Sequence, residues 1–214
     1  SEVDLCGHAT IATFHLLAEL DRVSLERGVN VFSQKTGAGV LPVEIHADEA
    51  HDITRIMMFQ VQPTIISTID NEELIADMLG TEALNILDAP GDVQVVSTGL
   101  PDLIVPVQDR ASLRDLEPDM GELASYCRRH DVVSAHAFCF ADDEGDATVY
   151  CRDFAPAVGI PEESATGTAN GALGAYLVLN ELVTVEEPIT HIVSEQGHEL
   201  GRPSRIDVAL RVEN

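Results

Sequence analysis

Lysine, and basic residues in general, are scarce in this sequence. Lys35 is the only lysine among 12 basic residues, which face 37 acidic residues and leave a formal net charge of −25. A chain this acidic repels nucleic acid and anionic membrane surfaces, so we expect neither as a partner. The shortage of lysine fits a salt-adapted host, and it fits equally a GC-rich genome that encodes arginine instead.

Motifs for metal binding and redox chemistry are also missing. The four cysteines form no Cys-x-x-Cys pair, no His-Glu-x-x-His occurs, and no other spacing is typical of metal ligands. We therefore expect no metal and no cofactor. Cys139 and Cys151 flank a predicted hairpin and could lie near each other, but free buried thiols are the favoured prediction.

Long apolar runs are absent as well. The longest runs are far too short to span a bilayer, and no basic segment followed by an apolar one opens the sequence as in a secretory signal. We therefore expect a cytoplasmic protein.

A glycine-led motif occurs twice in the chain. Residues 6–13 read Cys-Gly-His-Ala-Thr-Ile-Ala-Thr, and residues 165–172 read Ala-Thr-Gly-Thr-Ala-Asn-Gly-Ala. Each motif runs into a stretch of small and apolar residues, which predicts helices over His8–Leu20 and Ala169–Asn180. Neither stretch has a continuous polar face, so both helices are predicted to be buried and central.

The start of each predicted helix is a candidate anion site. A helix that begins at glycine presents unpaired backbone N–H groups and the positive end of its dipole. Such ends bind phosphate or carboxylate groups. Gly7 and Gly167 therefore suggest two related halves that face each other across one small anionic ligand. The alternative is that the small residues serve close packing alone.

The remaining pattern predicts an α+β fold in two lobes, each with several strands and one central helix. We place the lobes at residues 1–90 and 91–214, divided at the turn Asp88–Gly91, with the last strand free to return to the first lobe. Short apolar and β-branched runs predict the strands. These are Val29–Ser33, Val40–His46, Ile53–Gln60, Val93–Ser97, Leu103–Val107, Val133–Ala141, Ala147–Asp153, His191–Glu195 and Ile206–Val212. Further helices are predicted at Asn71–Leu79, Ser112–Leu116 and Pro118–Arg129.

Several motifs resemble those of the PhzF-like family of phenazine biosynthesis proteins, which shares the diaminopimelate epimerase fold. They occur in the family's order over nearly the whole chain. They are Glu2–Thr10, Ser97–Pro101 with Leu103–Val107, Arg152–Pro156, Gly159–Leu173 and Gln196–Ser204. The Cys-Gly-His-Ala-Thr and Ala-Thr-Gly-Thr-Ala-Asn-Gly-Ala-Leu runs are specific when they occur together.

The resemblance implies both a fold and a chemistry. The implied fold has two pseudo-symmetric lobes, each a bent mixed sheet or barrel around a central helix, with the active site at the N-termini of both helices. The implied reaction is isomerisation or epimerisation by proton transfer, without cofactor or metal. Helix N-termini would stabilise the developing negative charge, and a carboxylate or imidazole would move the proton. A homodimer is also implied.

The family's site residues match five positions here. Gly7 and Gly167 match the glycines whose N–H groups hold the substrate carboxylate, and Thr168 stands where the family has serine. His8 matches the histidine of the Gly-His-Ala-Thr run. Glu163 matches the acid/base aspartate and would lie on the far lobe.

Each assignment has a plainer alternative. His8 could simply be a helix-start residue satisfied by the backbone, and Glu163 could be a solvated acid that favours the helix dipole. Arg152 could bind a substrate carboxylate, but an arginine at a strand end is more often in a surface ion pair. The segment Gln196–Ser204 more readily closes a hairpin than binds ligand.

The sequence also departs from the family pattern. The family's general base is a glutamate that precedes the Cys-Gly-His-Ala-Thr run, and Glu2 is not that residue. Glu163 is one methylene longer than the family's aspartate. Cys6 fits the first cysteine of the related racemases, but Thr166 occupies the second position, so a two-thiol mechanism is unsupported.

The sequence therefore predicts a PhzF-like isomerase or epimerase for a small carboxylate-bearing metabolite. Its exchange activity is expected to be weak in the chain as given, while carboxylate binding persists. The alternative is a non-catalytic anion-binding or interaction protein derived from the same fold. A homodimer is expected, with the first lobe at or near the interface.

Overall fold

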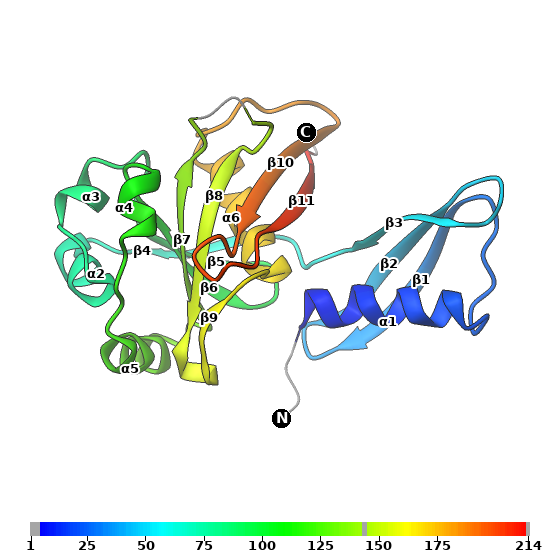
Figure 1. The fold of residues 1–214 in the computed structure, drawn as a ribbon, viewed down its shortest axis with the longest axis horizontal. Coiled ribbons are helices and arrows are strands. Elements are labelled where there is room, and N and C mark those ends of the chain that lie inside the picture. Colours follow the sequence, from blue (N-terminus) through cyan, green and yellow to red (C-terminus); the bar gives the residue numbers. More distant parts are fainter. Residues whose placement is uncertain (1–4, 143–144, 213–214) are drawn as a thin grey trace. The chain divides into compact units, whose positions relative to one another are not determined.

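The computed structural model describes residues 5–142 and 145–212 and separates the chain into two units, Ser1–Gln62 and Pro63–Asn214 (Figure 1). This division lies earlier than the boundary after residue 90 expected from the sequence. The reason is that β4 (Thr64–Thr68) pairs with β5 (Gln94–Ser97) and so joins the sheet of the second unit. Glu2 and the centre of the turn at 142–145 lie outside the described residues.

The first unit contains one helix and one sheet. Strands β1 (Gly28–Thr36), β2 (Gly39–Ala47) and β3 (Ile53–Met58) form a three-stranded antiparallel sheet. Alternate side chains of β2 are buried, as expected for a strand with one face against a core. That face packs toward α1 (Gly7–Glu19), whose Phe14 ring lies 5.9 Å from the Phe32 ring between centroids.

The helix α1 is not the buried central helix that the sequence predicts. Of its residues only Gly7 is buried, and Ile11 and Leu16 are 42% and 52% exposed. Within its unit the helix meets a sheet of three strands, which covers one side of it. A helix with small and apolar residues on all sides can therefore be covered by a sheet on one side only.

The second unit is built on an eight-stranded mixed sheet in the order β11-β10-β8-β7-β6-β5-β4, with β9 paired to β8. The pairs β6–β7 and β8–β10 are parallel, and the other pairs are antiparallel. The bounds of the remaining strands are β6 (Pro101–Pro106), β7 (Ser134–Phe140), β8 (Val149–Ala155), β9 (Ile160–Glu163), β10 (Ile189–Gln196) and β11 (Ser204–Arg211). The last strand pairs with β10, so it stays in the second unit and does not return to the first.

This sheet bends around α6 (Gly167–Leu179), which lies among its strands in Figure 1. The helix contacts β11 near one end of the strand order and β5, β6 and β7 toward the other. Every residue from Thr168 to Leu177 is buried, and Tyr176 packs edge-on against Phe138 of β7. The second unit therefore has the bent mixed sheet around a central helix that the sequence predicts.

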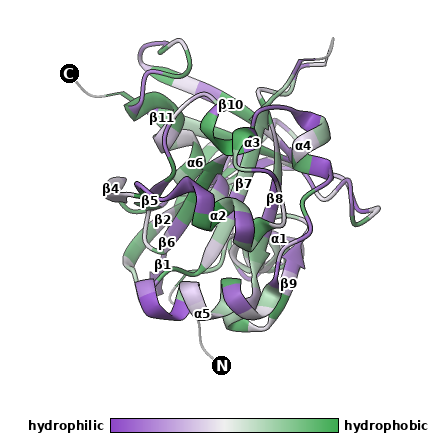
Figure 2. Cartoon of the chain, turned by 90° about the vertical axis from the view of Figure 1, so that its left-hand side faces the viewer, coloured by the Kyte–Doolittle hydropathy of each residue, from purple (hydrophilic) through white to green (hydrophobic). Residues whose placement is uncertain are grey.

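Shorter helices cover the other face of the sheet. They are α2 (Glu72–Leu79), α3 (Leu84–Leu87), α4 (Arg110–Arg114) and α5 (Met120–His130), and a 3₁₀ turn, η1 (Pro156–Val158), contacts α5. Asn71, Asp109 and Asp119 cap α2, α4 and α5 through side-chain oxygens. Figure 2 shows both hydrophilic and hydrophobic residues on α2 and α5, as expected for helices with one face on a core.

Four short elements were not predicted from the sequence: β4, α3, η1 and β9. All five residues of β4 are exposed, so it carries no alternation of buried and exposed positions. The sequence of β9, Ile-Pro-Glu-Glu, contains a proline and two acids and has no strand signal. These strands form because neighbouring strands offer open hydrogen-bonding edges.

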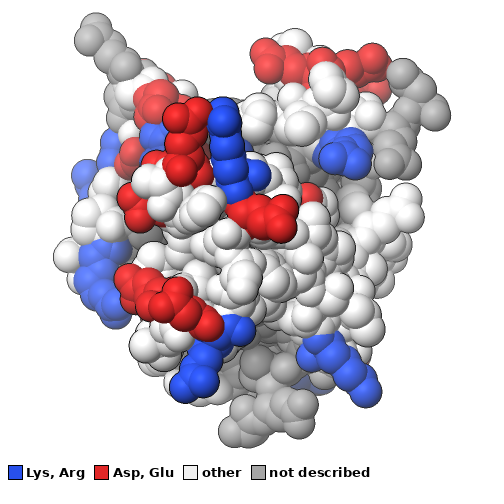
Figure 3. Space-filling model, turned by 90° about the vertical axis from the view of Figure 1, so that its right-hand side faces the viewer, with Lys and Arg blue, Asp and Glu red and all other residues white. Residues whose placement is uncertain are grey.

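The surface carries both signs of charge despite the acidic composition. On the face shown in Figure 3, Lys and Arg side chains lie among Asp and Glu side chains. Among the ion pairs of the molecule, Arg27 Nη2 lies 2.9 Å from Glu49 Oε1. Among the described residues, no helix combines the length and the apolar character needed to cross a membrane.

Candidate active site

The N-terminus of α6 is the part of the predicted site that lies in the second unit. Thr166 precedes the helix with an extended backbone, and Gly167 and Thr168 are its first residues. Thr166 does not cap the helix with its side chain but donates its hydroxyl proton to Asp153 Oδ2 at 3.0 Å. The start of the helix is thereby tied to strand β8. Backbone N–H groups and the positive dipole end favour an anion at this position.

Gln196 at the end of β10 holds the loop that leads into α6. Its Nε2 donates to the Glu163 carbonyl at 2.8 Å and to Thr166 Oγ1 at 3.1 Å. Its Oε1 accepts from the Thr166 amide at 3.2 Å and from Asn170 Nδ2 at 2.9 Å. The side chain is fully buried, so these bonds are shielded from water. The sequence assigns this segment only to a hairpin, which it also closes, because Gln196 pairs with Ser204.

Glu163 stands at the end of β9, opposite Asp153 of β8. It is half-buried and lies just before the loop that Gln196 holds. Within the described part of the chain, no hydrogen bond engages its carboxylate, in contrast to the carboxylate of its neighbour Glu162. Glu163 thus lies four residues before the start of α6, and its carboxylate has no hydrogen-bond partner among the described residues.

Arg152 does not form a surface ion pair, because its guanidinium donates hydrogen bonds to partners inside the protein. Its Nε and Nη2 donate to the two oxygens of Glu162 at 2.9 and 3.0 Å, and its side chain is 9% exposed. Its Nη1 donates to three backbone carbonyls at and just beyond the C-terminal end of α4, those of Leu113, Arg114 and Leu116. The guanidinium therefore links β8, β9 and α4 and has a structural function.

Gly7 and His8 begin α1 in the first unit. Gly7 is buried and His8 is exposed, and His8 Nε2 lies 3.8 Å from Cys6 Sγ. Thr10 fixes this end of the helix, since its Oγ1 lies 2.7 Å from the Cys6 carbonyl and 2.8 Å from Gln34 Oε1. The structure thus places Glu163, Gly167 and Thr168 within one unit and Gly7 and His8 within the other.

A buried polar cluster lies behind Thr166 and was not predicted from the sequence. Asp102 of β6 is opposite Ser134 of β7, and His136 of β7 is opposite Asp153 of β8. Ser134 Oγ lies 2.9 Å from Asp102 Oδ1 and 2.8 Å from Asp153 Oδ1, and His136 Nδ1 lies 3.0 Å from the same Asp153 oxygen. All four side chains are buried. Only the strand register brings them together, so spacing along the chain gives no signal for the cluster.

Burial perturbs the ionisation of this cluster. Desolvation, and next the charge of Asp153, raise the pKa of Asp102 from 3.8 to about 7, against opposing effects of Ser134 and His136. Burial lowers the pKa of His136, but Cys151 and the hydrogen bond to Asp153 outweigh it and raise this pKa to about 10. Among the described residues, Asp102 Oδ2 and His136 Nε2 make no well-formed hydrogen bond.

The raised pKa of Asp102 predicts that stability falls as pH rises. The folded state holds this proton more tightly than the unfolded chain, so the stabilisation is complete below about pH 4 and is lost as pH rises through about 7. Asparagine cannot ionise, so we expect the free energy of unfolding of Asp102→Asn not to fall in this way as pH rises. The rise in the pKa of Asp102 corresponds to a loss of at most about 4 kcal/mol in the free energy of unfolding. Urea unfolding of both proteins across this range measures the difference, and parallel pH curves for the two would contradict the prediction.

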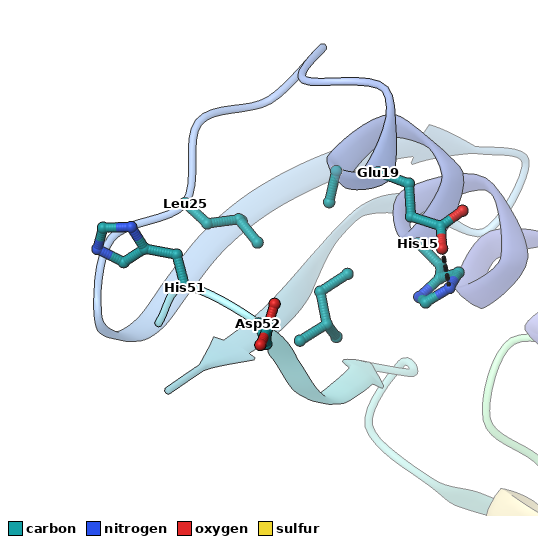
Figure 4. A pocket seen from close by; sticks show the side chains of 7 residues that line it. His15, Glu19, Leu25, His51 and Asp52 are labelled. Atoms are coloured by element: carbon teal, nitrogen blue, oxygen red, sulfur yellow. Dashed lines mark ion pairs between the residues drawn. The ribbon is translucent and has the colours of Figure 1, made fainter. Parts of the chain in front are cut away.

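A hollow of about 350 Å³ in the first unit contains none of the predicted site residues (Figure 4). It is lined by His15, Ala18, Glu19, Leu25, His51, Asp52 and Ile53. His15 pairs with Glu19 at 3.3 Å, whereas His51 points away from that pair in Figure 4.

In residues 5–142 and 145–212, no three His, Cys, Asp or Glu side chains are grouped so that they could hold a metal ion. The three buried cysteines of this part, Cys127, Cys139 and Cys151, are free thiols.

Comparison with known proteins identifies relatives along the whole chain. The model of the family described as phenazine biosynthesis-like protein matches residues 1–214. A protein of Clostridium acetobutylicum named an uncharacterized isomerase is 34% identical over 100% of this chain and 69% of its own length. The chain thus spans about two thirds of that relative.

Solved structures give the same fold. A PhzF-family phenazine biosynthesis protein of Bacillus anthracis superposes with a TM-score of 0.81 at 27% identity, covering 99% of this chain and 69% of that one. A predicted epimerase of Pseudomonas aeruginosa has a TM-score of 0.75 at 24% identity over 96% of this chain and 67% of its own, and so supports the fold alone. The α+β fold expected from the sequence is therefore confirmed.

Proposed function

This chain belongs to the phenazine biosynthesis-like protein family, and from that premise we propose that it is an isomerase or epimerase that moves a proton on a small carboxylate-bearing metabolite without a cofactor. Relatives named as isomerases and the fold shared with a PhzF-family protein support an isomerase-type enzyme. The finer statement about substrate and mechanism is our proposal.

The observation that carries the proposal is the N-terminus of α6 with Glu163 just before it. Gln196 and Asp153 hold the connecting loop through hydrogen bonds of 2.8 to 3.2 Å, so the first N–H groups of the helix are preorganised. Preorganised donors stabilise negative charge that develops on a substrate oxygen. A half-buried carboxylate that precedes the helix by four residues can take or return a proton.

The residues have distinct proposed roles. Gly167 and Thr168 bind the carboxylate oxygens of the substrate in the second unit, and Gly7 has the same role in the first. Glu163 is the acid/base group. His8 orients the substrate or relays a proton. Its ring is exposed and therefore accessible to a substrate, and its Nε2 lies 3.8 Å from Cys6 Sγ. The alternative, a non-catalytic anion-binding or interaction protein, is not favoured, because the relatives are named as isomerases.

Proton exchange in heavy water tests this function. The chain is incubated with a panel of small amino, hydroxy and unsaturated carboxylates, and deuterium uptake is followed by mass spectrometry. We expect slow uptake, above the rate without protein, at the carbon next to the carboxylate of at least one compound. A parallel NMR titration with the same compounds should shift the amides of Gly167 and Thr168. Amide shifts without uptake from any compound would support an anion-binding protein and contradict the isomerase.

A further inference from the structure

The buried cluster of Asp102, Ser134, His136 and Asp153 ends on Thr166, the residue that precedes α6. Asp153 Oδ1 lies within hydrogen-bonding distance of Ser134 Oγ and His136 Nδ1, and its Oδ2 accepts from Thr166 Oγ1. The side chain of Asp153 is 2% exposed. One carboxylate therefore connects the sheet interior to the start of the helix on which the proposed anion site depends.

Counting protons gives this chain of contacts a direction. The Ser134 hydroxyl has one proton, yet it lies 2.9 Å from Asp102 Oδ1 and 2.8 Å from Asp153 Oδ1. One of the two carboxyl groups must therefore carry a proton and donate it to Ser134. Asp153 already faces two other donors, His136 Nδ1 and Thr166 Oγ1, which favour its ionised form. The buried Oδ2 of Asp102 has no hydrogen-bond partner among the described residues, which favours the neutral form of this carboxyl group.

We propose that Asp102 is a neutral acid whose carboxyl proton is donated to Ser134 Oγ in a hydrogen bond, and that the Ser134 hydroxyl donates in turn to Asp153. These successive hydrogen bonds form a positioning network for the N-terminus of α6. Asp153 keeps its second oxygen for Thr166, so the helix start and the loop after Glu163 stay in the geometry that binds an anion. None of these residues touches the substrate. They act through Thr166, and this inference rests on the proposed function for its activity measurement only.

The network responds to pH through one group. When Asp102 ionises it becomes an acceptor, so Ser134 turns its proton toward Asp102 and Asp153 loses a donor. The other titratable groups that interact with Asp102 and Asp153 are His136 on β7 and Cys127 on α5, and Cys151 on β8 interacts with His136. The raised pKa of Cys127, about 11, and that of His136, about 10, keep both groups protonated near neutral pH. Loss of the Asp102 proton is therefore the ionisation expected near pH 7.

The test is a pH titration of the full chain by NMR, which does not require activity. We expect the amides of Thr166, Gly167 and Thr168 to shift with a midpoint near the Asp102 pKa of about 7. Asp102→Asn can still donate to Ser134 and should abolish this transition. Ser134→Ala should weaken it, since the relay is broken. Asp207→Asn and Ser125→Ala serve as controls, because both side chains lie outside the cluster at exposed contacts.

Activity and affinity distinguish positioning from simple structural support. The heavy-water exchange rate of the wild type should fall above about pH 7, while that of Asp102→Asn should stay level. Ser134→Ala should weaken binding of the exchanged carboxylate by about two- to tenfold at all pH values, the usual effect of one lost hydrogen bond. An unchanged amide transition in Asp102→Asn would overturn the network. If the amides show the expected transition but no compound takes up deuterium, the network is supported and the proposed reaction is contradicted.

Discussion

Replacing Glu163 with glutamine is expected to lower deuterium exchange into the substrate by about 10²- to 10⁴-fold, the usual contribution of general acid–base catalysis. Glutamine keeps the shape of the side chain and removes its ability to take a proton. Glu163 is half-buried, and among the described residues its carboxylate makes no hydrogen bond that the change would break. The free energy of unfolding should therefore change little.

The same variant separates catalysis from binding. The carboxylate is assigned to helix donors at Gly167 and Thr168, which the change leaves in place, so the Kd for a small carboxylate should rise less than the exchange rate falls. Glu162→Gln is unsuitable as a control because Glu162 holds Arg152. Glu195→Gln is better matched, since among the described residues the carboxylate of this half-buried acid has His198 as its one hydrogen-bond partner. Equal exchange by the wild type and Glu163→Gln would remove Glu163 from the mechanism.

Replacing Arg152 with alanine is expected to reduce the free energy of unfolding by about 3–5 kcal/mol, the range for breaking a buried ion pair. The change leaves the Glu162 carboxylate, itself 12% exposed, without its bidentate partner. It also removes the donor to the carbonyls of Leu113, Arg114 and Leu116. Buried polar groups that lose their partners carry the full cost of desolvation.

A surface arginine of the same sheet provides the control. Arg205 contacts both oxygens of Asp146 at 2.7 Å, so its geometry is as close as that of Arg152, but the two side chains are 44% and 73% exposed. Water and salt screen such a pair, and Arg205→Ala should change stability little. Urea unfolding measures both variants. Similar stability losses for the two would show that burial does not determine the contribution of Arg152.

The chemical pattern of the site is readable in the sequence because it lies in continuous segments. The run from Ala165 to Leu173 contains glycine at a helix start and only small or apolar residues after it, and it forms the buried helix α6 as expected. The strands with alternating or β-branched residues also form close to their predicted positions. The family motifs make Glu163, Gly167 and Thr168 candidate site residues for the same reason, since all three lie within the motif run Gly159–Leu173.

The sequence is less informative where a residue's environment depends on distant partners. The helix α1 has nearly the same composition of small and apolar residues as α6, yet it is largely exposed, because its unit supplies a sheet on one side only. Arg152 resembles a surface arginine in the sequence, yet it is buried because β9 brings Glu162 beside it. Composition cannot report how many neighbours surround an element.

Local sequence therefore determined the family, the α+β class, the central helix of the second unit and the residues at its start, because these depend on short motifs and on periodicity. Only the tertiary structure decided what supports that helix start. Asp102, Ser134 and Asp153 are contributed by three different strands, and Gln196 by a fourth. Strand register places their side chains within 3.2 Å of their partners, and register is set by the packing of the whole sheet.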